Sequence, residues 1–571
     1  MTTEILGVLV TYLITLLLAI PLGRLVGKIF KGEPNVFDFM APLERLIYRL
    51  GGVDARRDMT WKENLVALLT INAVWFVYAF VLLLTQAGLP LNPDGNPNMT
   101  PDQAFNTAIS FMVNCNLQHY SGESGLTYLT QTVVINFLMF VSAATGMAAL
   151  VLVVRSFLPE KTNLSGNFYV YFTKAITRVL LPGSLVIATL LVFSGTPASF
   201  AGKDQFVSMQ GDTVSVSRGP AAGLIAIKHL GTNGGGYFGA NSAHPLENPG
   251  YATNMLELVA QVMLPIIMLF ALGYMINRKR FAWTVFGVMT AGFLLLVVPT
   301  LLTEFHGNPA IARLGVAQPT GAMEGKEVRF GVLSSAYWSI ATTVISTGSV
   351  NSMHDSSMAL SGTMQLLGMM TNAFYGGCGV GFLNYYYYLI IAVFISGLMV
   401  GRTPELFGRK VEAREIKIAS LVALLSTLLV KGGTAIAAWV IVNYPNANWG
   451  TQPTAWLNNP GSHGFSEMLY EFTSANANNG SGFEGLGDGN VFWNVSTGLV
   501  MLLGRFVPII GPVAIAGLLA NKKFVPQSAG TLPTDTPTFG LMTFAVILLI
   551  TALSFFPALA LGPLAEYFSL K

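Results

Sequence analysis

The sequence predicts an all-α polytopic membrane protein with ten transmembrane helices, arranged as four membrane-pore-membrane repeats around a pseudo-fourfold axis. Three observations lead to this prediction. Of the 571 residues, 52% are hydrophobic and only 10% are charged, whereas soluble domains carry about 25% charged residues. Ten apolar runs are long enough to cross a bilayer at about 1.5 Å per residue. A shorter apolar run followed by a small polar triplet recurs four times.

The ten long runs lie at 5–30, 65–87, 129–154, 175–193, 255–275, 281–303, 358–400, 418–442, 491–519 and 539–561. The first has no basic start and no small-residue cleavage site, so we read it as a retained helix and not as a signal peptide. The seventh is too long for one helix, and a glycine-rich stretch from Tyr375 to Gly381 interrupts it. We therefore expect two half-helices there, with a break between them.

These runs divide the chain into six parts. They are an N-terminal helix with a polar loop (1–62), four pore repeats (63–160, 161–280, 281–416 and 417–525) and a C-terminal helix (526–571). Of the 31 Lys and Arg residues, 22 lie in the loops between spans that this topology assigns to the inner side, and five lie in the outer loops. Because cytoplasmic loops carry the excess of positive charge, we expect the N-terminus and all four pore loops to lie outside.

Each repeat contains one apolar run that is too short to span the bilayer, at 104–113, 221–230, 335–345 or 466–477. Irregular backbone at membrane depth is tolerated only where it lines a cavity or packs against protein. The triplet after each run begins with a small polar residue and ends with Gly or Asn, which best tolerate left-handed backbone. The triplets are Asn114-Cys115-Asn116, Thr232-Asn233-Gly234, Ser346-Thr347-Gly348 and Asn478-Asn479-Gly480.

The four triplets together predict a selectivity filter for a monovalent cation. Their carbonyl and side-chain oxygens would replace the water around the ion. None of them contains a carboxylate, which a divalent cation site would use. The spacing does not by itself decide between potassium and sodium. A single triplet could equally be a turn that caps a short helix, but four in the same context favour the filter.

Two basic residues lie within predicted spans, and three histidines flank the triplets. Arg505 and Lys431 would each be costly at the bilayer centre unless they face a cavity or a partner. Either residue could repel cations below the filter; a structural ion pair or a snorkelling end is the alternative. His119, His229 and His354 could orient the filter or respond to pH, or could make ordinary capping hydrogen bonds.

The sequence argues against several other functions. The basic residues are scattered, so nothing indicates nucleic-acid binding, and Cys115 and Cys378 form no disulfide framework. The stretch from Gly234 to Gly239 matches G-x-G-x-x-G but follows a short helix instead of a strand, which contradicts a dinucleotide site. Neither a G-x-x-x-x-G-K-[ST] nor an Asp-Lys-Thr-Gly motif occurs. We therefore identify no catalytic site; if ATP drives transport, another chain must hydrolyse it.

Four stretches of the sequence resemble the KdpA family, the potassium-translocating subunits of bacterial Kdp ATPases, and the resemblance extends over nearly the whole chain. The stretches are 228–245, 116–123, 353–356 and 397–405. The resemblance implies a potassium filter of the superfamily of potassium transporters, supported by Gln118. It also implies high-affinity, ATP-driven uptake across the bacterial inner (plasma) membrane, with no nucleotide bound by this chain. The implied partners are a P-type ATPase subunit (KdpB), KdpC, the small KdpF and membrane lipids.

In such a complex, potassium would pass sideways from the filter toward the ATPase subunit, and Arg505 matches the arginine that blocks the direct route inward. The possible exit route follows the predicted break, at Asn372, Gly376, Gly377 and Gly379. Here the sequence departs from the family, which has an acidic residue near position 372. A stand-alone potassium channel or an ion-coupled symporter of the same architecture is the alternative function. A membrane-embedded enzyme would need a converging acid, base or metal pair, which we do not find.

Overall fold

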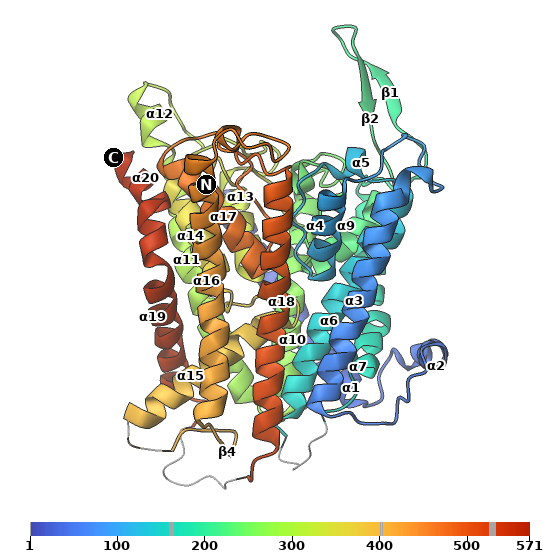
Figure 1. Cartoon of the computed structure of the whole chain (residues 1–571), viewed down its shortest axis with the longest axis vertical. Coiled ribbons are helices and arrows are strands. Elements are labelled where there is room, and N and C mark those ends of the chain that lie inside the picture. Colours follow the sequence, from blue (N-terminus) through green and yellow to red (C-terminus); the bar gives the residue numbers. More distant parts are fainter. Residues whose placement is uncertain (1, 159–164, 400, 402, 525–532, 571) are drawn as a thin grey trace.

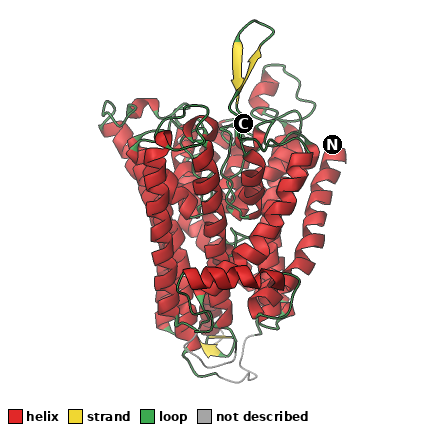
Figure 2. Ribbon diagram, turned by 90° about the vertical axis from the view of Figure 1, so that its right-hand side faces the viewer, coloured by secondary structure: helices red, strands yellow, loops and turns green. Residues whose placement is uncertain are grey.

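The helices of this chain fall into two length classes. The computed structural model describes residues 2–158, 165–399, 401, 403–524 and 533–570. Within these residues, ten helical segments are long and apolar enough to cross a membrane, and they run alongside one another (Figures 1 and 2). Much shorter helices lie between them. The chain is therefore a multi-pass membrane protein, as the composition predicts.

The spanning segments are α1 (Thr2–Lys31), α3 (Trp61–Thr85), a π-helical turn (Thr130–Asn136) with α6 (Phe137–Arg155), α7 (Phe168–Ala175) joined by a second π-helical turn (Ile176–Leu180) to α8 (Leu181–Phe193), α10 (Tyr251–Met275), α11 (Lys279–His306), α15 (Val380–Met399), α16 (Ala413–Asn443), α18 (Val491–Ala520) and α19 (Pro537–Leu561). The four short helices that precede the triplets are α4 (Pro101–Met112), α9 (Ala221–Leu230), α13 (Val332–Ile345) and α17 (Ser462–Ala477). We call these the pore helices.

The remaining helices are α2 (Ala41–Leu50), α5 (Gly122–Gly125), α12 (Pro309–Arg313), α14 (Ala359–Thr371) and α20 (Pro563–Ser569), with single 3₁₀ turns at Asp38–Met40, Gln86–Gly88, Asn241–Ala243 and Pro453–Ala455. Two antiparallel hairpins pair β1 (Asp204–Val207) with β2 (Thr213–Val216) and β3 (Glu405–Leu406) with β4 (Arg409–Lys410). The loop predicted at 194–218 therefore contains a hairpin, which projects from the end of the molecule that carries both chain termini (Figure 1). We call this the upper end.

The four predicted repeats are present. Each consists of a spanning helix, a pore helix and a returning segment: α3, α4 and α6; α7–α8, α9 and α10; α11, α13 and α14–α15; and α16, α17 and α18. The third returning segment is broken between α14 and α15, which confirms the predicted pair of half-helices. Val400, at the end of that predicted run, lies outside the described residues.

The pore helices are buried along almost their whole length, although they are rich in small polar residues. Every residue of α13 is buried, and α17 is exposed only near its first turn. Their polar side chains are therefore surrounded by protein, where other helices can supply hydrogen-bond partners. This explains how a helix too short to span the bilayer can end at mid-depth.

Close glycine contacts hold α1 against α10. A Cβ atom on Gly23 would lie 2.6 Å from the Cβ atom of Phe270, and one on Gly27 would lie 2.7 Å from the Tyr274 ring. The two glycines are four residues apart and so lie on one face of α1, in the small-residue spacing that lets membrane helices approach closely. This packing fixes the first helix to the returning segment of the second repeat.

We therefore predict that Gly23→Ala destabilises the protein, although alanine favours helix formation. The added methyl group would overlap Phe270 at a position close to its backbone, and overpacking of this kind costs roughly 1–3 kcal/mol. The matched control is Gly287→Ala in α11, where nothing lies within 4 Å of the new Cβ. Tryptophan fluorescence during heating of the detergent-solubilised protein measures both. Equal melting temperatures for the two variants would contradict the prediction.

Candidate ion-binding site

All four triplets have the same unusual backbone. The first residue of each is left-handed, with φ of 61° at Asn114, 50° at Thr232, 55° at Ser346 and 51° at Asn478. The third residue also has positive φ, 75° at Asn116, 83° at Gly234, 83° at Gly348 and 101° at Gly480. The middle residue does not. Positive φ is uncommon outside glycine and unfavourable for a β-branched residue such as Thr232. Its recurrence at equivalent positions therefore indicates one structure built four times.

The hydrogen bonding of the triplets repeats as well. The backbone N–H of each middle residue donates to the carbonyl five residues earlier in its pore helix. The pairs are Cys115 to Ser110 (2.9 Å), Asn233 to Lys228 (2.9 Å), Thr347 to Thr342 (3.0 Å) and Asn479 to Ser474 (2.9 Å). Among the described residues, no donor reaches the carbonyl oxygens of these four middle residues. Buried carbonyls normally have a partner, so these oxygens are available to a cation.

The triplets contact one another in a closed ring. A Cβ atom on Gly234 would overlap the carbonyl oxygen of Thr347, and one on Gly348 would overlap that of Asn479. On Gly480 it would overlap the carbonyl oxygen of Cys115. Each glycine thus admits the middle carbonyl of the next loop, so these positions require glycine for space as well as for φ.

Asn114 closes the ring between the first and second loops. Its side-chain nitrogen donates to the carbonyl oxygen of Thr232 at 3.0 Å, and its oxygen lies 3.3 Å from the side-chain nitrogen of Asn233. Ser142 of α6 holds this side chain by donating to the Asn114 oxygen at 2.9 Å. Gln118 joins the same two loops farther along, because it accepts from the Gly236 N–H at 2.8 Å.

Asn116 stands where the other three loops have glycine, and its side chain lies across their glycines. Its oxygen would be 2.6 Å from a Cβ on Gly348, and its nitrogen 2.5 Å from one on Gly234. Both polar atoms of the amide are buried without a hydrogen-bond partner among the described residues. The first loop therefore contributes an amide group as well as backbone to the centre of the ring.

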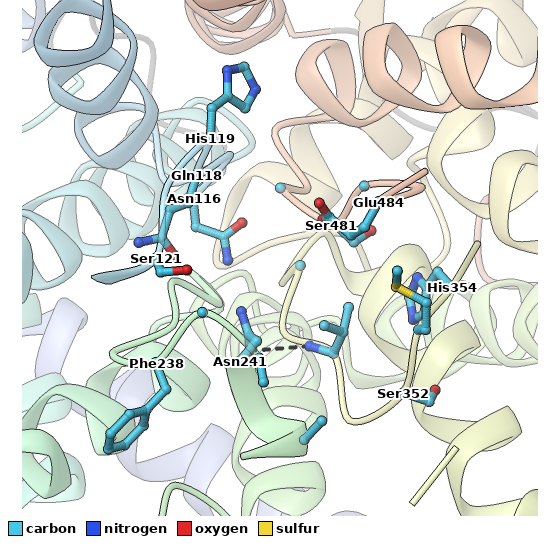
Figure 3. Close-up of a pocket in the computed structure, with 18 of the residues that line it drawn as sticks. Asn116, Gln118, His119, Ser121, Phe238, Asn241, Ser352, His354, Ser481 and Glu484 are labelled. Carbon is cyan, nitrogen blue, oxygen red and sulfur yellow. Dashed lines mark hydrogen bonds between the residues drawn. The ribbon is translucent and has the colours of Figure 1, made fainter. Parts of the chain in front are cut away.

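A cavity of about 500 Å³ opens above the ring toward the upper end, and we call it the vestibule. Asn116, Asn241, His354 and Glu484 line it, and Figure 3 shows Asn116 and Asn241 extending toward its middle. Asn241 also fixes the second loop, because its side-chain nitrogen donates to the Gly234 carbonyl at 3.1 Å. The sequence analysis included Asn241 only within the stretch 228–245 that resembles the family. It did not predict this contact, because no local sequence pattern indicates the turn that returns Asn241 to Gly234.

His119 belongs to an acidic group in the wall of this cavity. Its Nε2 lies 3.1 Å from Glu471 and 3.7 Å from Asp488. Burial alone would lower the pKa of His119, but Asp488 and Glu471 outweigh it and raise the pKa to about 10. Burial, together with Asp488 and Glu471, raises the pKa of Glu484. The cavity wall thus combines a cationic imidazole with several carboxylates.

His354 and His229 lie outside this acidic group. His354 makes a 2.9 Å hydrogen bond with the Tyr470 hydroxyl, and burial, with a smaller contribution from Lys326, lowers its pKa to about 3. His229 lies 3.0 Å from the Ile225 carbonyl and 3.3 Å from Glu257. Neither touches a triplet directly through these bonds. The geometry of both fits hydrogen bonds that brace the pore helices.

Below the ring, the break between α14 and α15 contacts the second and third triplets and the end of the fourth pore helix. The Cys378 N–H donates to the Thr232 hydroxyl at 2.9 Å. Asn372 accepts from the Ser346 hydroxyl at 2.9 Å and donates to the Ala477 carbonyl at 3.2 Å. Asn372 is itself left-handed, with φ of 45°. An uncharged amide thus occupies the position directly beneath the third and fourth loops.

The glycines of the break have different surroundings. A Cβ on Gly376 would overlap Gly381, and one on Gly379 would overlap the carbonyl of Gly146 in α6, so both are needed for packing. A Cβ on Gly377 would make ordinary contacts, 3.5 Å from the Ile345 carbonyl oxygen and 3.6 Å from the Thr232 hydroxyl. Gly377 therefore faces the underside of the ring with room beside it.

The two intramembrane bases lie in very different places. Arg505 of α18 is buried, and its guanidinium donates to the Ser142 carbonyl of α6 at 3.2 Å. No carboxylate of the described residues pairs with it. Lys431 of α16 instead lines a shallow groove formed largely by leucines on that helix. The structure therefore brings Arg505 beneath the ring and leaves Lys431 at the periphery.

Comparisons with known proteins identify the family. The family model described as KdpA, potassium-transporting ATPase A subunit, matches residues 9–568. The potassium-transporting ATPase potassium-binding subunit of Flavobacterium johnsoniae is 63% identical over 574 residues, covering 100% of both chains. The subunit of that name from Geobacillus kaustophilus is 45% identical over 560 residues, covering 98% of both.

A solved structure has a related fold. The potassium transporter TrkH from Vibrio parahaemolyticus matches with a TM-score of 0.50 and 15% identity, covering 78% of this chain and 83% of its own. At this identity the likeness concerns the fold alone. The sequence relatives and the family model cover essentially the whole chain, so the chain belongs to the KdpA family of potassium-transporting ATPase A subunits.

Proposed function

We propose that this chain binds potassium at the ring of triplets and translocates it as a subunit of an ATP-driven, high-affinity potassium uptake complex. One observation carries the proposal: the middle-residue carbonyls of Cys115, Asn233, Thr347 and Asn479 have no hydrogen-bond donor among the described residues, and three of them lie against the glycine of a neighbouring loop in the ring. The names of the relatives, potassium-transporting ATPase potassium-binding subunits, agree with this. Membership of this family favours a pump subunit over a stand-alone channel or an ion-coupled symporter.

The chemistry of the ring suits a dehydrated monovalent cation. Its ligands are neutral oxygens from backbone carbonyls and from the Asn116 amide, so each attracts the ion weakly and several must act together. A divalent ion would hold its water more strongly and would require carboxylates. The carboxylates lie outside the ring instead, at Glu471, Glu484 and Asp488 beside His119, so they would not bind the ion in the filter.

The path beyond the ring would turn sideways. Arg505 places a positive charge beneath the triplets, which opposes direct passage of a cation. The break at Asn372, Gly376, Gly377 and Gly379 offers polar backbone on another side, and a Cβ atom at Gly377 would make only ordinary contacts with Ile345 and Thr232. Asn372 would present an amide group at the position where the resemblance to the family implies an acidic residue. The ion would therefore leave past an uncharged group in this protein.

The partners and the orientation follow from the same hypothesis. The chain carries no ATPase motif, so a KdpB-like P-type ATPase subunit would hydrolyse ATP, assisted by KdpC-like and KdpF-like subunits. The distribution of basic residues supports an orientation with the N-terminus and the vestibule outside, and the bacterial sources of the relatives favour the inner membrane. Potassium would enter through the vestibule from the outer side.

The direct test measures ATP hydrolysis by membranes that contain this chain and its genetic neighbours, with and without potassium. We expect potassium to stimulate hydrolysis. The variant Gly348→Ala should abolish that stimulation, because its methyl group would overlap the Asn479 carbonyl at a residue with φ of 83°. Gly223→Ala in pore helix α9, where nothing lies within 4 Å, is the control. Undiminished potassium stimulation in Gly348→Ala would refute the proposed filter.

Replacing Arg505 tests the blocked route. We expect Arg505→Ala to permit ATP-independent potassium flux into proteoliposomes, because the charge that opposes cations beneath the ring is gone. Lys431→Ala removes an intramembrane charge of the same sign at the periphery and should leave the passive flux at the parental level. If the passive potassium flux through Arg505→Ala equals that of the parent while the variant still binds potassium, Arg505 has a structural role only.

A further inference from the structure

A second cluster of ionisable groups lies near the upper end, outside the vestibule lining. Asp355 follows the third triplet, His463 and Glu467 lie in the first turns of α17, and Glu566 lies in α20. The Nε2 atom of His463 is 3.0 Å from Asp355, and its Nδ1 atom is 3.0 Å from Glu566. Potential ligand atoms of Asp355, His463 and Glu467 all lie within 4.8 Å of one another.

The protein's own hydrogen bonds do not complete this cluster. Glu467 is fully buried; one of its carboxylate oxygens accepts from the Asn459 side chain at 3.1 Å, and the other has no partner among the described residues. One imidazole faces three carboxylates. Burial and the neighbouring Asp355 raise the pKa of Glu467. A buried, unpartnered carboxylate oxygen beside further acids is a costly arrangement unless a cation compensates it.

The geometry around His463 matches that of a metal ligand. Histidines that bind metals usually donate the N–H of the other ring nitrogen to a carboxylate, which orients the ring. Glu566 lies in this position at Nδ1, and so Nε2 is left to face Asp355 and Glu467. One imidazole nitrogen with two carboxylates is a donor set that Zn²⁺ accepts, with water as a fourth ligand.

We propose that His463, Asp355 and Glu467 bind one divalent transition-metal ion of the Zn²⁺ class, with Glu566 as the residue that positions His463. Ligands of such an ion lie roughly 2.0–2.2 Å from it, so the three side chains would draw slightly closer on binding. The ion would take the place of the proton on Nε2, which is released to solvent. Binding therefore strengthens as pH rises; the charged groups that face the imidazole ring are Asp355 and Glu566, with Glu467 beside them.

This ion would join parts of the chain that are distant in sequence. Asp355 belongs to the segment after the third triplet, the two α17 ligands belong to the fourth pore helix, and Glu566 belongs to the last helix. The segment after the fourth triplet closes over them, because a Cβ on Gly485 would overlap Glu467 and lie 2.8 Å from Asp355. A bound ion would therefore clamp the rims of the third and fourth pore loops together.

Titration of the purified full-length chain with Co²⁺, a spectroscopic substitute for Zn²⁺, tests the proposal. We expect visible ligand-field bands that saturate at one ion per chain, disappear on addition of Zn²⁺ and strengthen as pH rises, because the metal competes with a proton for the histidine ligand. His463→Gln should abolish the bands. His306→Gln, at an exposed histidine of α11, is the control and should retain them.

Two further measurements keep the test decisive if His463→Gln folds poorly. Glu566→Gln should weaken Co²⁺ binding roughly 10–100-fold without abolishing it, as expected for a positioning residue. Glu467→Gln should lose the Zn²⁺-induced rise in melting temperature and should melt no lower than the parent without metal. No Co²⁺ bands in the parent, or equal bands in His463→Gln, would overturn the proposal. Neither result would affect the potassium filter, which shares none of these residues.

Discussion

The structure depends on one constraint: backbone groups at membrane depth must be satisfied, except where an ion is to satisfy them. The four pore helices end in the interior, and at each end the middle-residue N–H returns to its own helix, while the middle carbonyl has no donor in the part of the chain that the structure describes. The spanning helices exist, in this view, to surround those ends with protein. An unpaired carbonyl in hydrocarbon would cost several kcal/mol, so the bundle has to exclude lipid completely from the ring.

Much of this architecture could be predicted from the sequence because it is encoded locally. Apolar length gives the ten spans, glycine content gives the break in the third repeat, and the polar triplets after short apolar runs give the ends of the pore helices. Each of those signals lies within some twenty residues. They reflect the partition of apolar side chains into lipid and the backbone conformations that glycine and asparagine tolerate. The hairpin β1–β2 was missed because its strands, Asp204–Val207 and Thr213–Val216, are only four residues long and mostly exposed, which leaves too short a pattern to recognise.

The contacts that make the ring and the acidic clusters could not be predicted in this way. Asn114 reaches Thr232 across more than a hundred residues, and His463 meets both Asp355 and Glu566 over similar separations. No periodicity or spacing relates such positions, because they meet only through the packing of different repeats. Composition and span length placed both Arg505 and Lys431 within the membrane, and only the resemblance to the family favoured Arg505 as the blocking charge; their positions became clear from the neighbours of α18 and α16.

A channel assembled from four identical chains must place four copies of every group around its axis. Here a single polypeptide supplies all four quarters, and the quarters are free to differ. Asn116 uses that freedom, since one amide lies where three glycines leave space, and four such side chains could not be accommodated together. The same broken symmetry allows a base under one quarter and a helix break under another. The space beneath a nearly symmetric ring can therefore favour one lateral direction through its static structure alone.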